Sequence, residues 1–473
     1  MGLEQLFRLS ESVLLVLALL ISTQHPIVLC LNNGLALTPA MGWNTWNRYG
    51  CEISEDIIIQ SVRAMKKIGL DKIGYQYINI DDCWQAPSRG LKKEPIADPI
   101  KFPRGIKYLA DEIHSLGFKL GIYSDAGTYT CGKRFGSLGF EEIDAKTYAE
   151  WGVDYLKYDN CYNEGQSGTP DLSASRYRRM RDALNSTGRP ILYSMCSWGE
   201  DAVWNWASTI ANSWRISGDI TDNFDRYDDR CPCEGSVQPC LLAGYYCSVT
   251  NILEKSAGIG QKAGRGGWND LDNLEVGNGG MTHDEYVTHF SMWALLKSPL
   301  ILGNDVTSFS PESLSIITNQ GIIALNQDPA NSAGYRVWKR PDPNGGSNGS
   351  GGIQLWRADL VNGSFALAFL NLTPRKVTHS IDLAEFFNGD TFGNSYWSVI
   401  DLWNEGKNST ISSHTIIKKN LNNIRDDSQT LLMKKSLRFG FDEVEFVSQS
   451  DSIEFREVPI HGIRVLRLNR INY

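Results

Sequence analysis

The sequence predicts an α/β fold, a (β/α)8 TIM barrel followed by a C-terminal antiparallel β-sandwich domain. Strand-like and helix-like segments alternate from about residue 40 to 320. Eight strand-like segments lie in this stretch, the number that a closed barrel requires. After about residue 330 the helical periods vanish and short strand-like segments follow one another, which favours a sandwich.

Four of the predicted barrel strands contain a short apolar run that ends in carboxylates, at Asp81-Asp82, Asp125, Asp159 and Asp219. Between the predicted strands, Ser54-Glu55-Asp56 is a typical start for a helix, and Gly69 is a typical stop. Further helices are predicted over 106–116, 140–152, 172–188 and 283–297. The strands lie near Met41–Trp46, Tyr75–Trp84, Lys119–Ala126, Val153–Cys161, Pro190–Trp198, Asn212–Asp219, Gly266–Leu271 and Pro299–Asn304.

The C-terminal region contains no chemical motif. Ile353–Leu360 and Ser364–Asn371 flank Val361-Asn362-Gly363, a typical hairpin connection. Three more strands are predicted at 444–447, 452–457 and 462–468. The expected division of the chain is a signal peptide at 1–30, the catalytic barrel at 31–328 and the sandwich at 329–473.

The N-terminus predicts export. Val13–Ile21 is an unbroken apolar run preceded by Arg8, and it is too short for a bilayer that needs about 20 residues. We therefore expect a secreted protein that has no membrane segment after signal cleavage. The net charge of −8 argues against a nucleic-acid partner. The sequence leaves the oligomeric state open, a homo-oligomer included.

Cysteines and sequons fit an exported protein. The chain has ten cysteines, and nine remain if Cys30 leaves with the signal peptide, so one thiol is left over. The cluster Cys231-Pro-Cys233…Cys240…Cys247 favours two local disulfides over zinc, because Cys-x-Cys is too short for paired zinc ligands. Sequons for N-glycosylation lie at Asn185, Asn348, Asn362, Asn371 and Asn408.

Carboxylates recur at the C-terminal ends of the predicted strands, where the active sites of such barrels lie. Because side chains alternate along a strand, Lys157 and Asp159 share one face and should lie inside the barrel mouth. The same alternation pairs Asn79 with Asp81, Tyr123 with Asp125, and Arg215 with Asp219.

A carboxylate cluster of this kind is the equipment of a glycosidase, which needs one carboxyl as acid and another as nucleophile or base. None of the seven histidines lies in a strand-end motif, which disfavours a metallohydrolase, and no cofactor or metal is expected. Lys157 is expected to lower the pKa of Asp159 and keep it ionised. The chemistry alone leaves the catalytic pair open among Asp81, Asp82, Asp125, Asp159, Asp219, Asp270 and Asp272.

Five motifs in order resemble those of glycoside hydrolase family 27, and most closely its secreted fungal α-galactosidases. The resemblance runs from about Gly34 to Asn326 and includes the Arg230–Cys247 loop. Over the C-terminal region it depends mainly on domain order. The motifs are Met41-Gly-Trp-Asn-Thr-Trp46, Asp81-Asp-Cys-Trp84, Leu156-Lys-Tyr-Asp-Asn-Cys161, Trp214-Arg-Ile-Ser-Gly-Asp219 and Gly266-Gly-Trp-Asn-Asp-Leu-Asp272.

The resemblance implies a role for each matching residue. Asp159 is expected to be the nucleophile and Asp219 the acid/base of a retaining exo-α-galactosidase that acts on melibiose, raffinose-type oligosaccharides or galactomannan. Asp125 and Asp270 are then expected to be structural. The resemblance also implies the disulfides Cys51–Cys83, Cys131–Cys161, Cys231–Cys247 and Cys233–Cys240, which leave Cys196 unpaired. The galactose-holding positions are Trp46, Asp81, Asp82, Tyr123, Lys157, Arg215 and Asp272.

One position, Ser197, departs from the usual pattern of the family's α-galactosidases. Ser197 and Glu200 match the positions where the family distinguishes galactose from N-acetylgalactosamine. Serine at the first is typical of α-N-acetylgalactosaminidases, whereas glutamate at the second restores bulk. Galactose remains the expected substrate, with an α-N-acetylgalactosaminidase as one alternative and a non-catalytic galactose-binding protein as another.

Overall fold

A computed structural model describes residues 31, 33–226, 246–341, 351–387, 390, 395–404, 414–418 and 446–471. The predicted signal peptide at 1–30 lies outside the described residues. None of the helices in the described ranges combines the length and the apolar character of a membrane span.

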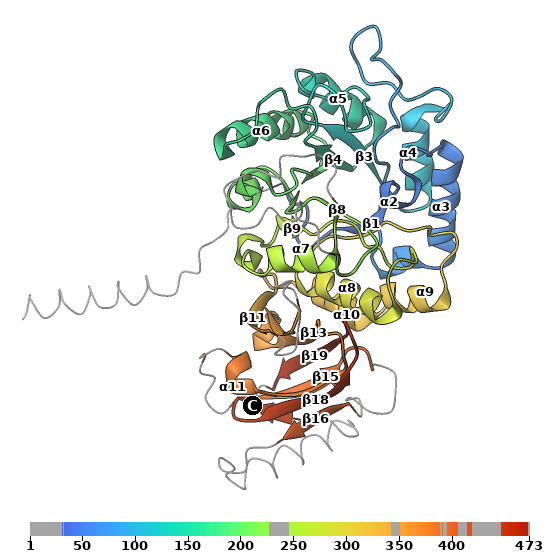
Figure 1. Ribbon diagram of the computed structural model, residues 1–473. Coiled ribbons are helices and arrows are strands. Elements are labelled where there is room, and N and C mark those ends of the chain that lie inside the picture. The colour runs from blue at the N-terminus through green and yellow to red at the C-terminus, as the bar shows by residue number, and fades with distance from the viewer. Residues whose placement is uncertain are drawn as a thin grey trace, which may run out of the picture.

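Eight parallel strands form one curled sheet, which confirms the predicted barrel (Figure 1). Their order is β10-β1-β2-β3-β4-β5-β6-β9. A parallel bridge between Leu274 and Leu302 joins the two edges. The strands are β1 (Met41–Asn44), β2 (Tyr77–Asn79), β3 (Lys119–Asp125), β4 (Tyr155–Asp159), β5 (Leu192–Met195), β6 (Ser213–Arg215), β9 (Trp268–Asp270) and β10 (Leu300–Leu302).

Helices cover the outside of this sheet, and their termini follow the sequence. Ser54 caps the first long helix by accepting a hydrogen bond from the Ile57 amide, and Gly69 follows that helix in a left-handed conformation. The helices are α2 (Trp46–Tyr49), α3 (Glu55–Lys67), α4 (Gly105–Ser115), α5 (Glu141–Trp151), α6 (Pro170–Ser186), α7 (Val249–Ser256), α8 (His283–Leu295), α9 (Pro311–Ile317) and α10 (Gln320–Asn326).

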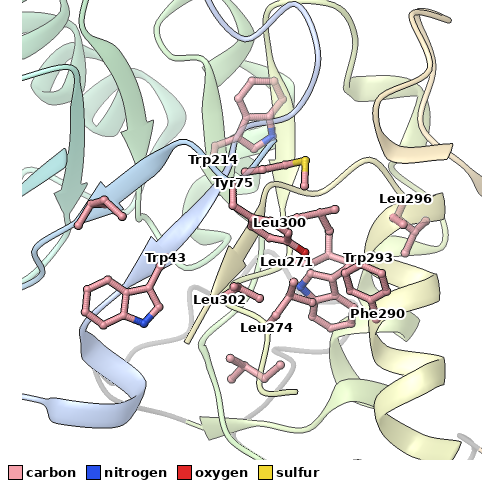
Figure 2. Close-up of a cluster of buried hydrophobic side chains, with 14 of the residues drawn as sticks. Trp43, Tyr75, Trp214, Leu271, Leu274, Phe290, Trp293, Leu296, Leu300 and Leu302 are labelled. Carbon is pink, nitrogen blue, oxygen red and sulfur yellow. The ribbon is translucent and has the colours of Figure 1, made fainter. Parts of the chain in front are cut away.

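The core between sheet and helices is rich in tryptophan. Trp43, Trp214 and Trp293 are fully buried in one apolar cluster with Leu271 and Leu300 (Figure 2). The Trp293 indole also donates a hydrogen bond of 2.8 Å to the carbonyl of Asp272, which ties this core to the open end of the barrel.

Antiparallel strands form the C-terminal sandwich, as predicted. A six-stranded sheet and a three-stranded sheet enclose an apolar core around Phe369, Phe455 and Trp397. A short helix, α11 (Leu383–Phe386), completes the domain. The first sheet contains β11 (Tyr335–Arg340), β12 (Ile353–Asp359), β13 (Phe365–Asn371), β19 (Ile463–Arg470), β15 (Tyr396–Asp401) and β17 (Phe446–Ser448), and the second contains β14 (Val377–Asp382), β18 (Ser452–Val458) and β16 (Thr415–Lys418).

The disulfides Cys51–Cys83 and Cys131–Cys161 are formed, and Cys196 is free and buried. Three cysteines of the two other predicted pairs, Cys231, Cys233 and Cys240, lie outside the described residues. The sequons at Asn348 and Asn408 also lie outside them.

One predicted glycosylation position does not suit the folded chain. Asn371 is fully buried, and its amide nitrogen donates hydrogen bonds of 2.8 Å to the Arg375 carbonyl and 2.7 Å to the Pro459 carbonyl. A glycan would replace one of the two hydrogens on that nitrogen, so at least one of these bonds would be lost, and the buried side chain leaves no space for the sugar. Asn185 and Asn362, in contrast, are exposed.

Candidate active site

The carboxyl ends of the barrel strands surround a cavity of about 520 Å³. Lys157 and Asp159 line this cavity, whereas Leu156 and Tyr158 pack in the apolar core, which is the alternation that the sequence predicted. The other predicted residues that line it are Trp46, Asp81, Asp82, Tyr123, Arg215, Asp219 and Asp272.

Asp159 lies at the end of β4 and is 7% exposed. Its Oδ2 accepts a hydrogen bond of 2.8 Å from the Tyr123 hydroxyl, and its Oδ1 accepts one of 3.0 Å from the backbone amide of Asn160. The disulfide sulfur of Cys131 lies 3.6 Å from Oδ2. These contacts fix the carboxylate on the cavity wall.

Burial raises the pKa of Asp159 to about 7, although the Lys157 ammonium and the Tyr123 hydroxyl oppose this effect. Lys157 thus lowers this pKa, as expected, but the expectation that it would keep the pKa of Asp159 low was wrong. The reason is that Lys157 Nζ makes its close ion pair, of 2.6 Å, with Asp81 Oδ2 rather than with Asp159. Burial therefore outweighs the effect of the more distant lysine on the pKa of Asp159.

Asp219 reaches the same cavity from a different backbone path than predicted. The sheet strand β6 ends at Arg215, and Asp219 begins a separate two-residue strand, β7 (Asp219–Ile220), that pairs with β8 (Tyr246–Cys247). Ser217 and Gly218 interrupt the strand, so simple alternation does not place Asp219. Its side chain is 31% exposed, and its charge raises the pKa of Asp159.

Arg215 links two of the carboxylates. Its Nη2 donates a hydrogen bond of 2.9 Å to Asp219 Oδ1 and forms an ion pair of 2.7 Å with Asp272 Oδ2. The Ile220 amide donates 2.8 Å to the same Asp272 oxygen. Burial lowers the pKa of the guanidinium, but Asp272 and Asp219 outweigh it and raise that pKa well above its usual value. The guanidinium therefore stays charged and holds both carboxylates.

A second polar group forms around Asp81 on the opposite wall. Its Oδ2 accepts hydrogen bonds from Lys157 at 2.6 Å and from the Asn44 amide at 2.7 Å. The neighbouring Asp82 accepts 2.6 Å hydrogen bonds from the amides of Gly132 and Cys83. Fixed carboxylate oxygens of this kind can accept hydrogen bonds from sugar hydroxyls.

Ser197 and Glu200 are not among the residues that line the cavity. Ser197 is buried. Glu200 accepts a hydrogen bond of 2.8 Å from the side-chain amide of Asn160, the residue after the nucleophile candidate Asp159. The backbone at Trp198 and Asp201 is left-handed, so this loop folds in a way that a residue-by-residue transfer of roles does not anticipate.

About half of the residues that line the cavity were not predicted from the sequence. Glu275 lies there, with hydrogen bonds from the side-chain amides of Asn47 and Asn278. Burial raises the pKa of Glu275 to about 8, against the effect of these bonds. Glu275 follows Asp272 by three residues, and its place after a predicted strand end is the sequence feature that could have revealed it.

Asp125 and Asp270 do not line this cavity, in keeping with a structural role. Asp125 is fully buried beside Asp159 in the β3–β4 register and accepts a hydrogen bond from the Cys161 amide. It also lies near Cys131 and Cys161 in a group with the geometry of a metal site. Both sulfurs belong to the disulfide and are not thiolate ligands.

We expect Lys157→Met to shift the acidic limb of the pH profile of kcat/KM upward. Because Lys157 lowers the pKa of Asp159, its removal raises that pKa, and the ionised form of Asp159 then appears only at higher pH. The shift should be about one pH unit or more. The position of the limb is compared with that of Lys119→Met, which changes an exposed lysine at the start of β3. If the limb does not move, the acidic limb does not report the ionisation of Asp159.

The fold and the site define a glycoside hydrolase, with paired carboxylates at the mouth of a (β/α)8 barrel. The family described as Alpha galactosidase A matches residues 38–328, and the Alpha galactosidase C-terminal beta sandwich domain matches residues 350–421. The chain therefore belongs to the α-galactosidases of glycoside hydrolase family 27.

Relatives and solved structures agree. The chain is 52% identical to Alpha-galactosidase mel1 of Schizosaccharomyces pombe over 79% of this chain and 84% of the relative. It resembles the α-galactosidase I structure from Mortierella vinacea, with 48% identity, a TM-score of 0.79, and coverage of 92% of this chain and 98% of that one. It also resembles the Saccharomyces cerevisiae α-galactosidase with raffinose, with 42% identity, a TM-score of 0.82, and coverage of 93% and 99%.

Proposed function

We propose that this α-galactosidase is a retaining exo-enzyme that releases terminal α-galactosyl residues from melibiose, raffinose-type oligosaccharides and galactomannan. The observation that carries the proposal is the placement of Asp159 and Asp219 on one cavity, one buried at a barrel strand end and the other partly exposed on β7. The raffinose in the similar Saccharomyces cerevisiae structure supports the substrate class.

In the proposed reaction, an Asp159 oxygen attacks the anomeric carbon and forms a β-galactosyl ester. Asp219 protonates the departing glycosidic oxygen at the same time. Asp219 then removes a proton from water, whose oxygen attacks the anomeric carbon, displaces the Asp159 carboxylate and releases α-galactose. This double displacement requires the two carboxyl groups to be about 5–5.5 Å apart.

The remaining cavity residues are proposed to hold the sugar. Asp81 and Lys157 form one ion pair on one wall, and Arg215 and Asp272 form another. Each pair presents charged acceptors and donors to hydroxyl groups, and Trp46 offers an apolar face to the pyranose. Tyr123 holds Asp159 in the attacking position through its hydrogen bond.

We propose that the protein is exported and glycosylated at Asn185 and Asn362. The apolar run at 13–21, the two formed disulfides and the exposure of both asparagines support this. Peptide mapping of the protein secreted by a eukaryotic host tests it. Unmodified asparagines at both positions would remove the glycosylation proposal.

The first-formed anomer tests the retaining mechanism. Hydrolysis of melibiose is followed by proton NMR within the first minutes, before mutarotation. We expect α-galactose to appear first, because two inversions at the anomeric carbon restore its configuration. If β-galactose appears first, the mechanism is inverting and Asp159 is not a nucleophile.

Substrate preference is a separate question, because Ser197 departs from the usual pattern. We propose galactose, since neither Ser197 nor Glu200 lines the cavity where a 2-acetamido group would need space. The ratio of kcat/KM on the p-nitrophenyl α-glycosides of galactose and N-acetylgalactosamine tests this. A preference for the acetamido sugar would overturn it.

A further inference from the structure

The sandwich domain contacts the segment that carries Asp219. His461 lies in the turn between β18 and β19, and its imidazole stacks on Phe224, with ring centroids 4.8 Å apart and an interplanar angle of 22°. Phe224 is buried and lies five residues after Asp219. We propose that His461 is a positioning residue for the acid/base Asp219; this rests on the proposed function of Asp219.

His461 is held firmly on the barrel. Its Nδ1 lies 2.6 Å from Glu285 Oε1 of α8, and its carbonyl accepts a hydrogen bond of 2.7 Å from the Thr288 hydroxyl on the same helix. Its backbone is left-handed, with a φ of 56°. Helix α8 therefore holds the His461 imidazole in place, and the face of this ring packs on the Phe224 ring.

The same helix also holds the middle of the segment. The Tyr286 hydroxyl, next to Glu285 in α8, donates a hydrogen bond of 2.9 Å to Asp222 Oδ1. Asp222 lines the catalytic cavity and lies between Asp219 and Phe224. The segment is thus attached to α8 at Asp222 and, through His461, at Phe224.

Among the described residues, the segment has further contacts within the barrel, including the hydrogen bond from Arg215 to Asp219. The Ile220 amide donates to Asp272, and the Thr250 amide donates 3.0 Å to the Phe224 carbonyl. These bonds hold the backbone, whereas the stacked imidazole packs on the Phe224 ring. Loss of His461 would leave a void beside that ring and remove one hydrogen-bond partner of Glu285, so the segment and Asp219 could shift.

A displaced acid/base affects substrates unequally. Melibiose needs a proton on its departing oxygen, whereas 2,4-dinitrophenolate leaves without one. Because kcat/KM reports the steps up to and including the first irreversible one, here departure of the leaving group, His461→Ala should lower kcat/KM on melibiose by about tenfold. On 2,4-dinitrophenyl α-galactoside, kcat/KM should change less than about twofold.

Phe224→Leu removes the stacked ring while it keeps an apolar side chain of similar size, and it should give the same selective loss. The matched control is His379→Ala, because His379 stacks on Phe369 inside the sandwich, with ring centroids 5.7 Å apart. It should leave kcat/KM on both substrates unchanged. Melting curves confirm that each variant is folded at the assay temperature.

The outcomes separate this inference from the proposed function. The reference is Asp219→Asn, which should show the selective loss in its strongest form. If it does not, the role of Asp219 is wrong. If it does, but His461→Ala and Phe224→Leu lose activity equally on both substrates or not at all, His461 does not position the acid/base.

Discussion

Asp159→Asn is expected to abolish turnover, with kcat lowered by at least about 10⁴-fold on every α-galactoside. An amide cannot form the galactosyl ester, so both steps of the double displacement are lost. The change is close to isosteric. Its amide nitrogen should replace Oδ2, because the Tyr123 hydroxyl can turn and accept a hydrogen bond, whereas the Asn160 amide at Oδ1 can only donate.

The variant should remain folded and bind galactose, as measured by calorimetry. Burial raises the pKa of Asp159 from 3.8 to about 7, so the protonated form stabilises the fold below about pH 4 and this stability is lost as the pH rises through 7. An asparagine stays neutral throughout. We therefore expect a Tm at pH 7 no lower than that of the unchanged protein.

The control for this prediction is Asp154→Asn. Asp154 precedes β4 at the opposite end of the same strand, where it pairs with Arg189 at 2.6 Å. Loss of this pair can lower stability, but it leaves the cavity intact, and kcat should stay within about twofold. Activity of Asp159→Asn within tenfold of the unchanged enzyme would remove the nucleophile assignment.

Patterns of apolar side chains predicted the fold because each pattern fixes which face of its strand or helix is buried. Lys157 and Asp159 alternate with Leu156 and Tyr158, and a strand can satisfy that pattern only with its apolar face toward the helices. The position of Asp219 could not be predicted in this way. Ser217 and Gly218 interrupt the strand, and the pairing of β7 with β8 positions the Asp219 carboxylate.

The charges in the site depended on packing that a sequence does not contain. Only Tyr158 separates Lys157 from Asp159, yet the lysine pairs with Asp81, which lies 76 positions away in the chain. Burial then decided the pKa of Asp159. The wall around Glu275 was missed for a related reason, because Asn47 and Asn278 reach it from segments that no single motif joins.

Asp219→Asn is expected to lower kcat/KM on melibiose by about 10³-fold, within the range of general acid catalysis. The Arg215 guanidinium occupies Asp219 Oδ1, which leaves Oδ2 to deliver the proton. On 2,4-dinitrophenyl α-galactoside, kcat/KM should stay within about tenfold, because that leaving group needs no acid. Its kcat should fall and recover with added azide, which attacks the galactosyl ester without a base.

Glu275 is the rival proton donor, since burial raises its pKa to about 8 and it lines the same cavity. Both of its oxygens, however, accept hydrogen bonds from the amides of Asn47 and Asn278. Glu275→Gln therefore should not produce a loss that depends on the leaving group. If Glu275→Gln produces such a loss and Asp219→Asn does not, the proton donor is Glu275 rather than Asp219.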